Sequence, residues 1–131
     1  MSNFPPVPGA DWFLRSLKLQ AATAAAGYTL VNGTGGVVSW TAPADGNNHR
    51  FLVIASLDVT SAETGGAAGV NFTAPDGTSS PFQQLFAGGQ AADAYGAMLS
   101  AVIESGSTVF INQTSALTAG AAKLWAEIWG S

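Results

Sequence analysis

The stretch HRFLVIASLDVTS, from His49 to Ser61, decides the fold. It follows the turn sequence PADGNN (43–48) and is rich in aliphatic, β-branched and aromatic residues. Proline and an Asp-Gly pair favour a turn, whereas Val, Ile and Phe fit the surface of a pleated sheet. We therefore expect a core strand that leaves the turn with His49 at its polar lip. A similar TAP-DG sequence at residues 73–77 predicts a second strand end by the same turn chemistry.

Turn signals recur along the rest of the chain, which is typical of an all-β domain. They lie at residues 32–36, 43–48, 63–69, 75–80, 87–90, 105–107 and 118–121. The segments between them predict strands at residues 28–31, 37–40, 50–61, 68–74, 82–86, 94–104, 107–114 and 122–130. This pattern predicts a β-sandwich of two antiparallel sheets.

The beginning of the chain allows two interpretations. In SLKLQA (16–21), Leu17, Leu19 and Ala21 alternate with Lys18 and Gln20, which indicates a half-buried strand. In the other interpretation, residues 12–26 form a helix between an Asp cap and a Gly cap. Residues 1–14 hold three of the six prolines, so we expect a short extended arm there and a single domain over residues 15–131.

Composition points to a subunit of an assembly. Hydrophobic residues make up 47% of the chain and charged residues only 9%, compared with roughly 25% charged in an average soluble domain. Such a surface has little charge repulsion to oppose self-association. The four basic residues are scattered and the net charge is −4, which argues against nucleic acid as a partner.

The chain contains no cysteine, so disulfides and thiolate chemistry are excluded. It shows no signal-peptide pattern and no apolar window long enough to span a bilayer. We therefore expect no membrane partner, and a protein made in a cytoplasm.

No catalytic constellation is evident. His49 is the only histidine, and although Asp45 and Asp58 lie near it in the sequence, no G-x-S-x-G motif supplies a nucleophile. The Asp45 turn lacks the ligand spacing of a calcium loop, and one histidine is too few for a typical zinc site. We predict no enzymatic activity, no catalytic residue, no metal site and no cofactor.

The last strand predicts an interaction surface. In KLWAEIWGS (123–131), Leu124, Ala126 and Ile128 alternate with Trp125 and Trp129, so one face meets the core and the other presents two tryptophans. Tryptophan is enriched in protein interfaces. We expect the interface to include these tryptophans together with apolar residues of the arm: Phe4, Pro5, Pro6, Val7 and Trp12.

The order and spacing of these segments, from about Arg15 to Gly130, resemble the trimeric jelly-roll proteins of phage particles, which share their fold with tumour necrosis factor and the complement heads. The resemblance rests on VVSWTAPADG, HRFLVIASLDVTS as an exposed edge strand, VNFTAPDGTSS, AYGAMLSAVIESGSTVFINQT and AKLWAEIWG. It implies a jelly roll, three subunits around an axis and no enzyme. Tail-fibre members of this group usually follow a long stalk, whereas only about fourteen residues precede the domain here.

Three functions follow as hypotheses. The first is a non-enzymatic phage virion protein: a homotrimeric capsid decoration, or cement, protein that binds the major capsid protein or another virion protein. The second is a receptor-binding tail-fibre tip that recognises a cell-surface glycan. The third is a small β-sandwich hydrolase, for which the sequence offers no catalytic pair.

Overall fold

A computed structural model of the chain describes residues 17–131. These residues form nine β-strands and no helix, which confirms the all-β prediction. The strands are β1 (Lys18–Ala22), β2 (Tyr28–Thr29), β3 (Gly35–Thr41), β4 (His49–Gly65), β5 (Ala68–Thr73), β6 (Gln83–Phe86), β7 (Asp93–Ile103), β8 (Thr108–Gln113) and β9 (Leu117–Gly130). The predicted arm, residues 1–14, lies outside the described residues.

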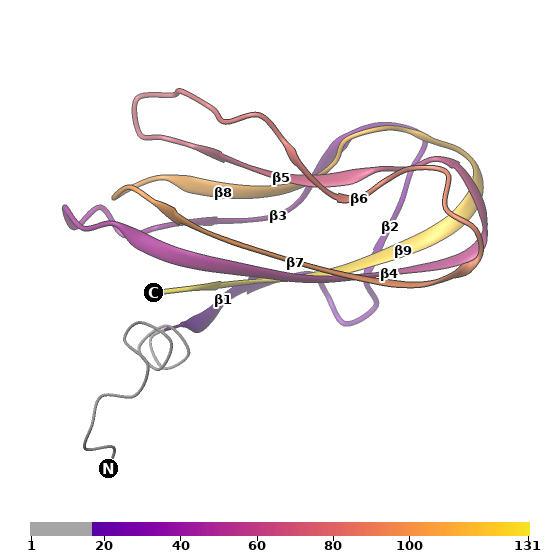
Figure 1. Ribbon diagram of the computed structural model, residues 1–131, viewed down its shortest axis with the longest axis horizontal. Helices are drawn as coiled ribbons and strands as arrows, with labels where there is room; N and C mark the ends of the chain where they lie inside the picture. Colours follow the sequence, from indigo (N-terminus) through magenta and orange to yellow (C-terminus); the bar gives the residue numbers. More distant parts are fainter. Residues whose placement is uncertain (1–16) are drawn as a thin grey trace, which may run out of the picture.

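The strands pair in a nested order: those nearest the two ends of the sequence pair with each other, and each following pair lies further inside the sequence. β1 and β2 pair with β9, β3 with β8, β4 with β7 and β5 with β6, all antiparallel. One sheet has the order β1-β9-β4-β7, with β2 also on β9, and the other has the order β3-β8-β5-β6. The two sheets face each other as layers (Figure 1). This nesting of pairs in two antiparallel sheets is a jelly-roll β-sandwich.

The core lies between the two sheets. In β4 every second residue from Phe51 to Val59 is buried, and in β9 Leu124, Ala126 and Ile128 are buried as predicted. The second sheet contributes Val70, Val109 and Ile111. The stretch 49–61 is therefore a core strand, but the expectation that it lies at an exposed edge is wrong, because β4 pairs with β9 on one side and β7 on the other.

The strand interpretation of residues 16–21 is confirmed over Lys18–Ala22, and the described part of the alternative helix, residues 17–26, is not helical. The prediction that Leu17, Leu19 and Ala21 share one buried face is wrong, since the side chain of Leu19 is about half exposed. A register shift between Leu19 and Ala21 pairs them with the successive residues Trp129 and Ile128. Such a bulge interrupts the alternation, so Leu19 points away from the core while Ala21 packs against it.

A second correction concerns residues 118–121, predicted as a turn. They belong to β9, and pair with the end of β4 through three register shifts between Val59 and Gly65. Gly120 has φ +91°, and a Cβ there would lie 2.2 Å from the carbonyl oxygen of Ala62. Glycine is therefore required by a bulged strand at this position, rather than by a turn.

Gln113, at the end of β8, fastens the segment before β3 to the core. Its Nε2 donates to the carbonyl oxygens of Val31 (2.7 Å) and Ser115 (2.9 Å), and its Oε1 accepts from Val31 N (3.0 Å) and Tyr28 Oη (3.3 Å). The side chain is fully buried. Its amide thus makes three hydrogen bonds to backbone groups and one to the Tyr28 hydroxyl.

Candidate interaction surface

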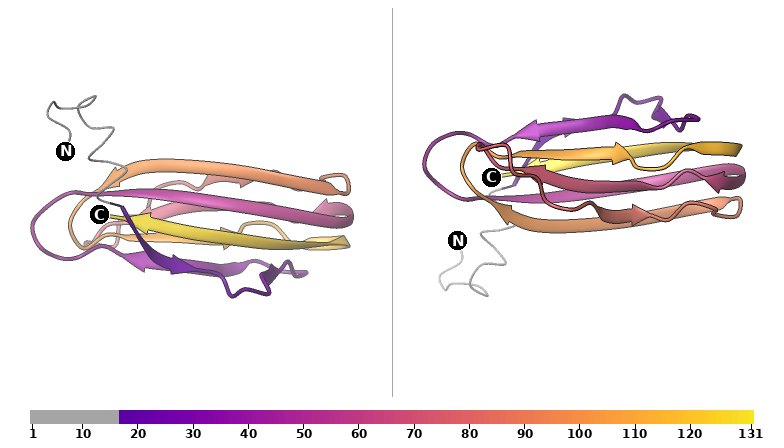
Figure 2. Two further views of the ribbon diagram at one scale, coloured as in Figure 1. Left: turned by 90° about the horizontal axis from the view of Figure 1, so that it is seen from below. Right: turned by 90° about the horizontal axis from the view of Figure 1, so that it is seen from above.

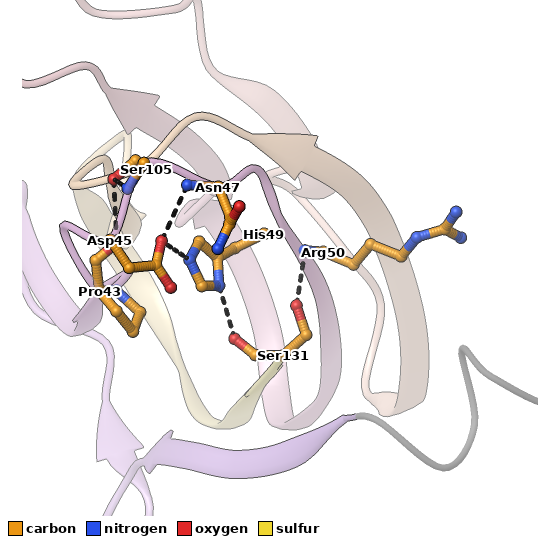
Figure 3. Close-up of polar contacts among 8 residues, drawn as sticks. Pro43, Asp45, Asn47, His49, Arg50, Ser105 and Ser131 are labelled. Carbon is orange, nitrogen blue, oxygen red and sulfur yellow. Dashed lines mark hydrogen bonds and ion pairs between the residues drawn. The ribbon is translucent and has the colours of Figure 1, made fainter.

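His49 lies where β4 leaves the Asp45 turn, as expected, but it is buried (7% exposed) rather than on the surface. Its Nε2 lies 2.9 Å from Asp45 Oδ1 and its Nδ1 lies 2.7 Å from the carbonyl oxygen of Ser131 (Figure 3). Its ring also meets Trp40 edge to face, with the centroids 6.5 Å apart. His49 thus joins the turn, the sheet and the last residue of the sequence.

The electrostatics of this pair are those of a structural contact. The hydrogen bond that His49 donates to Asp45 raises the pKa of His49, with a further contribution from Ser131, and the same bond lowers the pKa of Asp45. A triad histidine would use its second nitrogen on a nucleophile. Here that nitrogen meets a backbone carbonyl, while the Ser131 hydroxyl accepts from Arg50 N at 3.0 Å. The arrangement therefore contains no activated serine.

The two turn carboxylates cap their own turns. Asp45 Oδ1 accepts from Asn47 N at 3.0 Å, and Asp76 Oδ1 accepts from Thr78 N at 2.9 Å. Gly46 and Gly77 supply the positive φ. Within residues 17–131, no group of three or more His, Asp or Glu side chains is placed to hold a metal ion. The described residues also include no helix with the length and hydropathy needed to cross a membrane.

Glu63 is a buried carboxylate that sequence reasoning did not single out. Its Oε1 accepts from Gln90 N at 3.2 Å, whereas its Oε2 is buried without a hydrogen-bond partner. Gly66 lies against Oε2 so closely that a Cβ would come within 2.6 Å of it. Burial raises the pKa of Glu63. Among the described residues, the Gln90 N–H is the only hydrogen-bond partner of this carboxylate.

The outward side of the β1-β9-β4-β7 sheet carries large apolar side chains, and we call it the outer face. Met98 is 69% exposed, Val102 52% and Ile54 37%. Leu19 is also exposed, and Leu52 and the two predicted tryptophans are half-buried there. Strand register places Leu52 beside Trp129 and Ile54 beside Met98. The apolar side chains therefore extend across all four strands.

The predicted interface residues are only partly placed. Trp125 and Trp129 point outwards from β9, as the alternation predicted, whereas Phe4, Pro5, Pro6, Val7 and Trp12 lie outside the described residues. Trp125 also serves its own chain: its Nε1 donates to the carbonyl oxygen of Ala25 at 3.0 Å, and its ring covers Gly27. Trp129 lines a pocket with Leu17, Leu52 and Ile54.

Sequence reasoning missed the exposed residues of β4 and β7. In AYGAMLSAVIE (94–104) both alternating sets are apolar, so periodicity could not say which set faces the core. The pairing decides it, because Met98 is opposite the outward Ile54 and Leu99 opposite the buried Val53. One signal was available in the sequence. Apolar residues occupy both the odd-numbered and the even-numbered positions of this segment, whereas a strand with only one buried face needs them at every second position.

Together the nested strand pairs and the order of the two sheets define a fold class, the jelly-roll β-sandwich. No protein-family model matches the chain, and no curated protein matches it. The comparison with solved structures therefore rests on fold alone.

Structures of infectious bursal disease virus have this fold. The Gx strain structure superposes with a TM-score of 0.57 at 13% identity, covering 87% of this chain and 32% of that chain. The T13 particle gives 0.53 at 16% identity, covering 86% and 31%. A mutant VP2 protein in derived T=1 particles gives 0.52 at 14%, covering 87% and 31%. The chain spans about a third of the length of each of these proteins.

Proposed function

We propose that the chain is a non-enzymatic structural subunit of a virion, specifically a homotrimeric phage decoration protein bound to the major capsid protein on the outside of the head. The observation that carries the proposal is the apolar outer face on a jelly-roll fold. Apolar side chains spread over one sheet face of a protein with few charges mark an interaction surface.

The trimer contact is proposed on the β1 side of the outer face. Leu19, exposed because of its bulge, lies opposite Trp129 in the strand register. The indole Nε1 of Trp129 is buried and has no acceptor among the described residues. Because this nitrogen is shielded from solvent, the proposed contact rests instead on the exposed Leu19 and on the half-buried ring of Trp129.

The arm is proposed as the capsid contact. Phe4, Pro5, Pro6, Val7 and Trp12 supply apolar surface, and a proline-stiffened segment loses less entropy on docking than a flexible one. The glycan-binding alternative has less support. The indole N–H of Trp125, which a sugar hydroxyl would need, is already bonded to Ala25.

Binding to undecorated phage heads tests the proposal. We expect the full chain to bind and a chain lacking residues 2–9 to bind at least about tenfold more weakly, a difference of only about 1.4 kcal/mol. A Ser39→Lys variant, changed on the opposite sheet, should bind like the wild type. Failure of the full chain to bind heads would overturn the capsid assignment.

A further inference from the structure

A sheet ends at edge strands, whose unpaired backbone groups can accept a strand from another molecule. Proteins discourage this with short edges, bulges, prolines or charged side chains. In this jelly roll the edges are β1 and β7 in one sheet and β3 and β6 in the other, while β2 also borders β9. The edges differ sharply in how well they are protected.

Three of the four edges are interrupted or short. β1 has five residues, begins with Lys18 and is bulged after Leu19. β3 has a register shift between Gly36 and Val38. β6 has only four residues, and its pairing with β5 is also shifted. None of these three offers a long regular backbone to another strand.

β7 is the exception. It pairs with β4 over eleven consecutive residues, from Asp93 to Ile103, without a register shift. It contains no proline and no basic residue, and Asp93, at its first position, is its only charge. Figure 2 shows it along one border of its sheet, with β4 on its inner side.

The free side of β7 has hydrogen-bonding capacity to offer. In an antiparallel pair alternate residues exchange their bonds with the neighbour, so the other residues direct their N–H and C=O groups away from it. Among the described residues, β7 forms strand pairs only with β4, so those groups face no further strand. A hollow of about 450 Å³ also lies at the end of the strand, between Val102 and the loop that contains Ser79 and Ser80.

We propose that β7 pairs with β7 of a second copy of this chain, antiparallel and around a two-fold axis at Met98, so that two five-stranded sheets join into one continuous sheet. Centring on Met98 keeps all eleven residues paired, and it is consistent with charge. Asp93 then lies opposite Ile103 of the partner subunit, so the two aspartates do not face each other.

Side chains on both surfaces of the joined sheet favour this arrangement. Met98 and Val102 are the two most exposed large apolar residues of the described chain, and each would gain a cross-strand neighbour. On the inner side, the half-buried Tyr95, Ala97 and Leu99 already pack against the core. A second strand would extend that apolar layer beyond the present sheet edge.

The two-fold contact is separate from the proposed trimer contact, which lies at the opposite border of the sheet, and it does not depend on capsid binding. If both contacts form, the assembly contains an even number of copies that is also a multiple of three. Loss of the β7 contact halves the mass, whereas loss of the Leu19 contact divides it by three.

Disulfide trapping tests the contact directly, because the chain has no cysteine of its own. The two residues at a two-fold centre of paired strands have Cα atoms about 4.5–5.5 Å apart, which a disulfide can bridge. We expect Met98→Cys to form an interchain disulfide at least about tenfold faster than Ser39→Cys, because pairing raises the local thiol concentration. Equal rates for the two variants would overturn the proposal.

Charge complementation provides the second measurement. Met98→Lys and Met98→Glu each place like charges at the axis, so light scattering should show half the wild-type mass for either variant alone. Mixing the two should restore the full mass, because opposite charges then face each other. Unfolding is monitored by thermal melting, and Ser39→Lys serves as the matched surface control. Wild-type mass in the separate variants, or no recovery in the mixture, would contradict β7 pairing.

Discussion

At the scale of single residues, His49 and Asp45 form a hydrogen-bonded pair whose contribution to stability depends on pH. The pKa of His49 is raised above its ordinary value of 6.5, so its contribution to stability is present below that pH and is lost as pH rises through the folded-state pKa. The pKa of Asp45 is lowered from 3.8, so its contribution is present above that pH and lost as pH falls through the folded-state pKa. The contact between His49 and Asp45 therefore stabilises the fold most between pH 3.8 and pH 6.5, the ordinary pKa values of the two groups.

Replacing His49 with Gln should therefore lower the melting temperature more at about pH 5.5 than at about pH 8. The same comparison with Asn47→Ala, a change in the same turn, controls for general damage to the loop. An equal loss at both pH values would show that the imidazolium is not part of the contact. Assembly should persist, because His49 points to the sheet interior and away from the outer face.

For Glu63 we predict that removing the charge stabilises the protein, whereas the His49 substitution destabilises it. Burial raises its pKa above 4.5, which means that the folded state binds its proton more tightly than the unfolded state. Its contribution to stability is therefore fully present below pH 4.5 and is lost as pH rises through the folded-state pKa. Glu63→Gln keeps an acceptor for Gln90 N and removes the buried charge.

We expect Glu63→Gln to melt at a higher temperature than the wild type at about pH 7.5, with the difference shrinking towards about pH 4. Glu104→Gln, on the exposed turn after β7, is the matched control. A variant that melts lower than the wild type at neutral pH would mean that the carboxylate has a favourable partner in the folded protein.

At the scale of elements, Gln113 determines how the chain enters β3. Gln113→Leu would leave Val31 N, the Ser115 carbonyl and the Tyr28 hydroxyl without this partner, whereas the Val31 carbonyl keeps the hydrogen bond from Leu117 N. Because each unsatisfied buried polar group costs about 1–3 kcal/mol, we expect a loss of about 3 kcal/mol or more in chemical denaturation. Asn112→Ala, on the opposite face of the same strand, should cost much less. Similar losses for the two variants would contradict the role given to Gln113.

The bulge between β4 and β9 should tolerate no side chain at Gly120. Both Gly120 and Gly46 have positive φ, but only Gly120 has backbone where a Cβ would be. Gly46→Ala should cost only about 1–2 kcal/mol for the left-handed conformation, while Gly120→Ala should cost clearly more because the strands must separate. Equal melting temperatures for the two variants would show that the close approach to Ala62 is not required.

These elements also show what could be predicted from the sequence. The alternation in KLWAEIWGS determines which side of β9 is buried, and the Asp-Gly turns mark the beginning of β4 and the end of β5. The bulges at Leu19 and Gly120 could not be predicted, because one extra residue in a strand leaves no signal in composition and depends on the partner's register. The outer face was foreseen only at Trp125 and Trp129, since Met98 and Leu99 are equally apolar.

At the scale of the whole molecule, the assembly should contain copies in multiples of three. Leu19→Lys places a charge in the proposed trimer contact on a side chain that is already exposed, so the folded subunit should keep its melting temperature. Light scattering should then show one third of the wild-type mass. A wild-type monomer at micromolar concentration would contradict both proposed contacts, and an unchanged mass for Leu19→Lys would place the trimer contact elsewhere.

The arm should contribute to attachment rather than to the fold. Deleting residues 2–9 removes Phe4, Val7 and three prolines, and it leaves in place every core residue of the part of the chain that the structure describes. The melting temperature of the isolated protein should therefore stay nearly unchanged. A large drop in the absence of capsid would make the arm part of the domain.

The central claim, that this jelly roll is a subunit on the outer surface of a phage head, is tested most directly by electron cryo-microscopy of the parent particle. Particles with and without this chain are reconstructed and compared. The account predicts three-fold density on the outside of the head, built from copies of this sandwich in a multiple of three and absent from particles that lack the chain. Density at the tail tip, or identical heads with and without the chain, would contradict it.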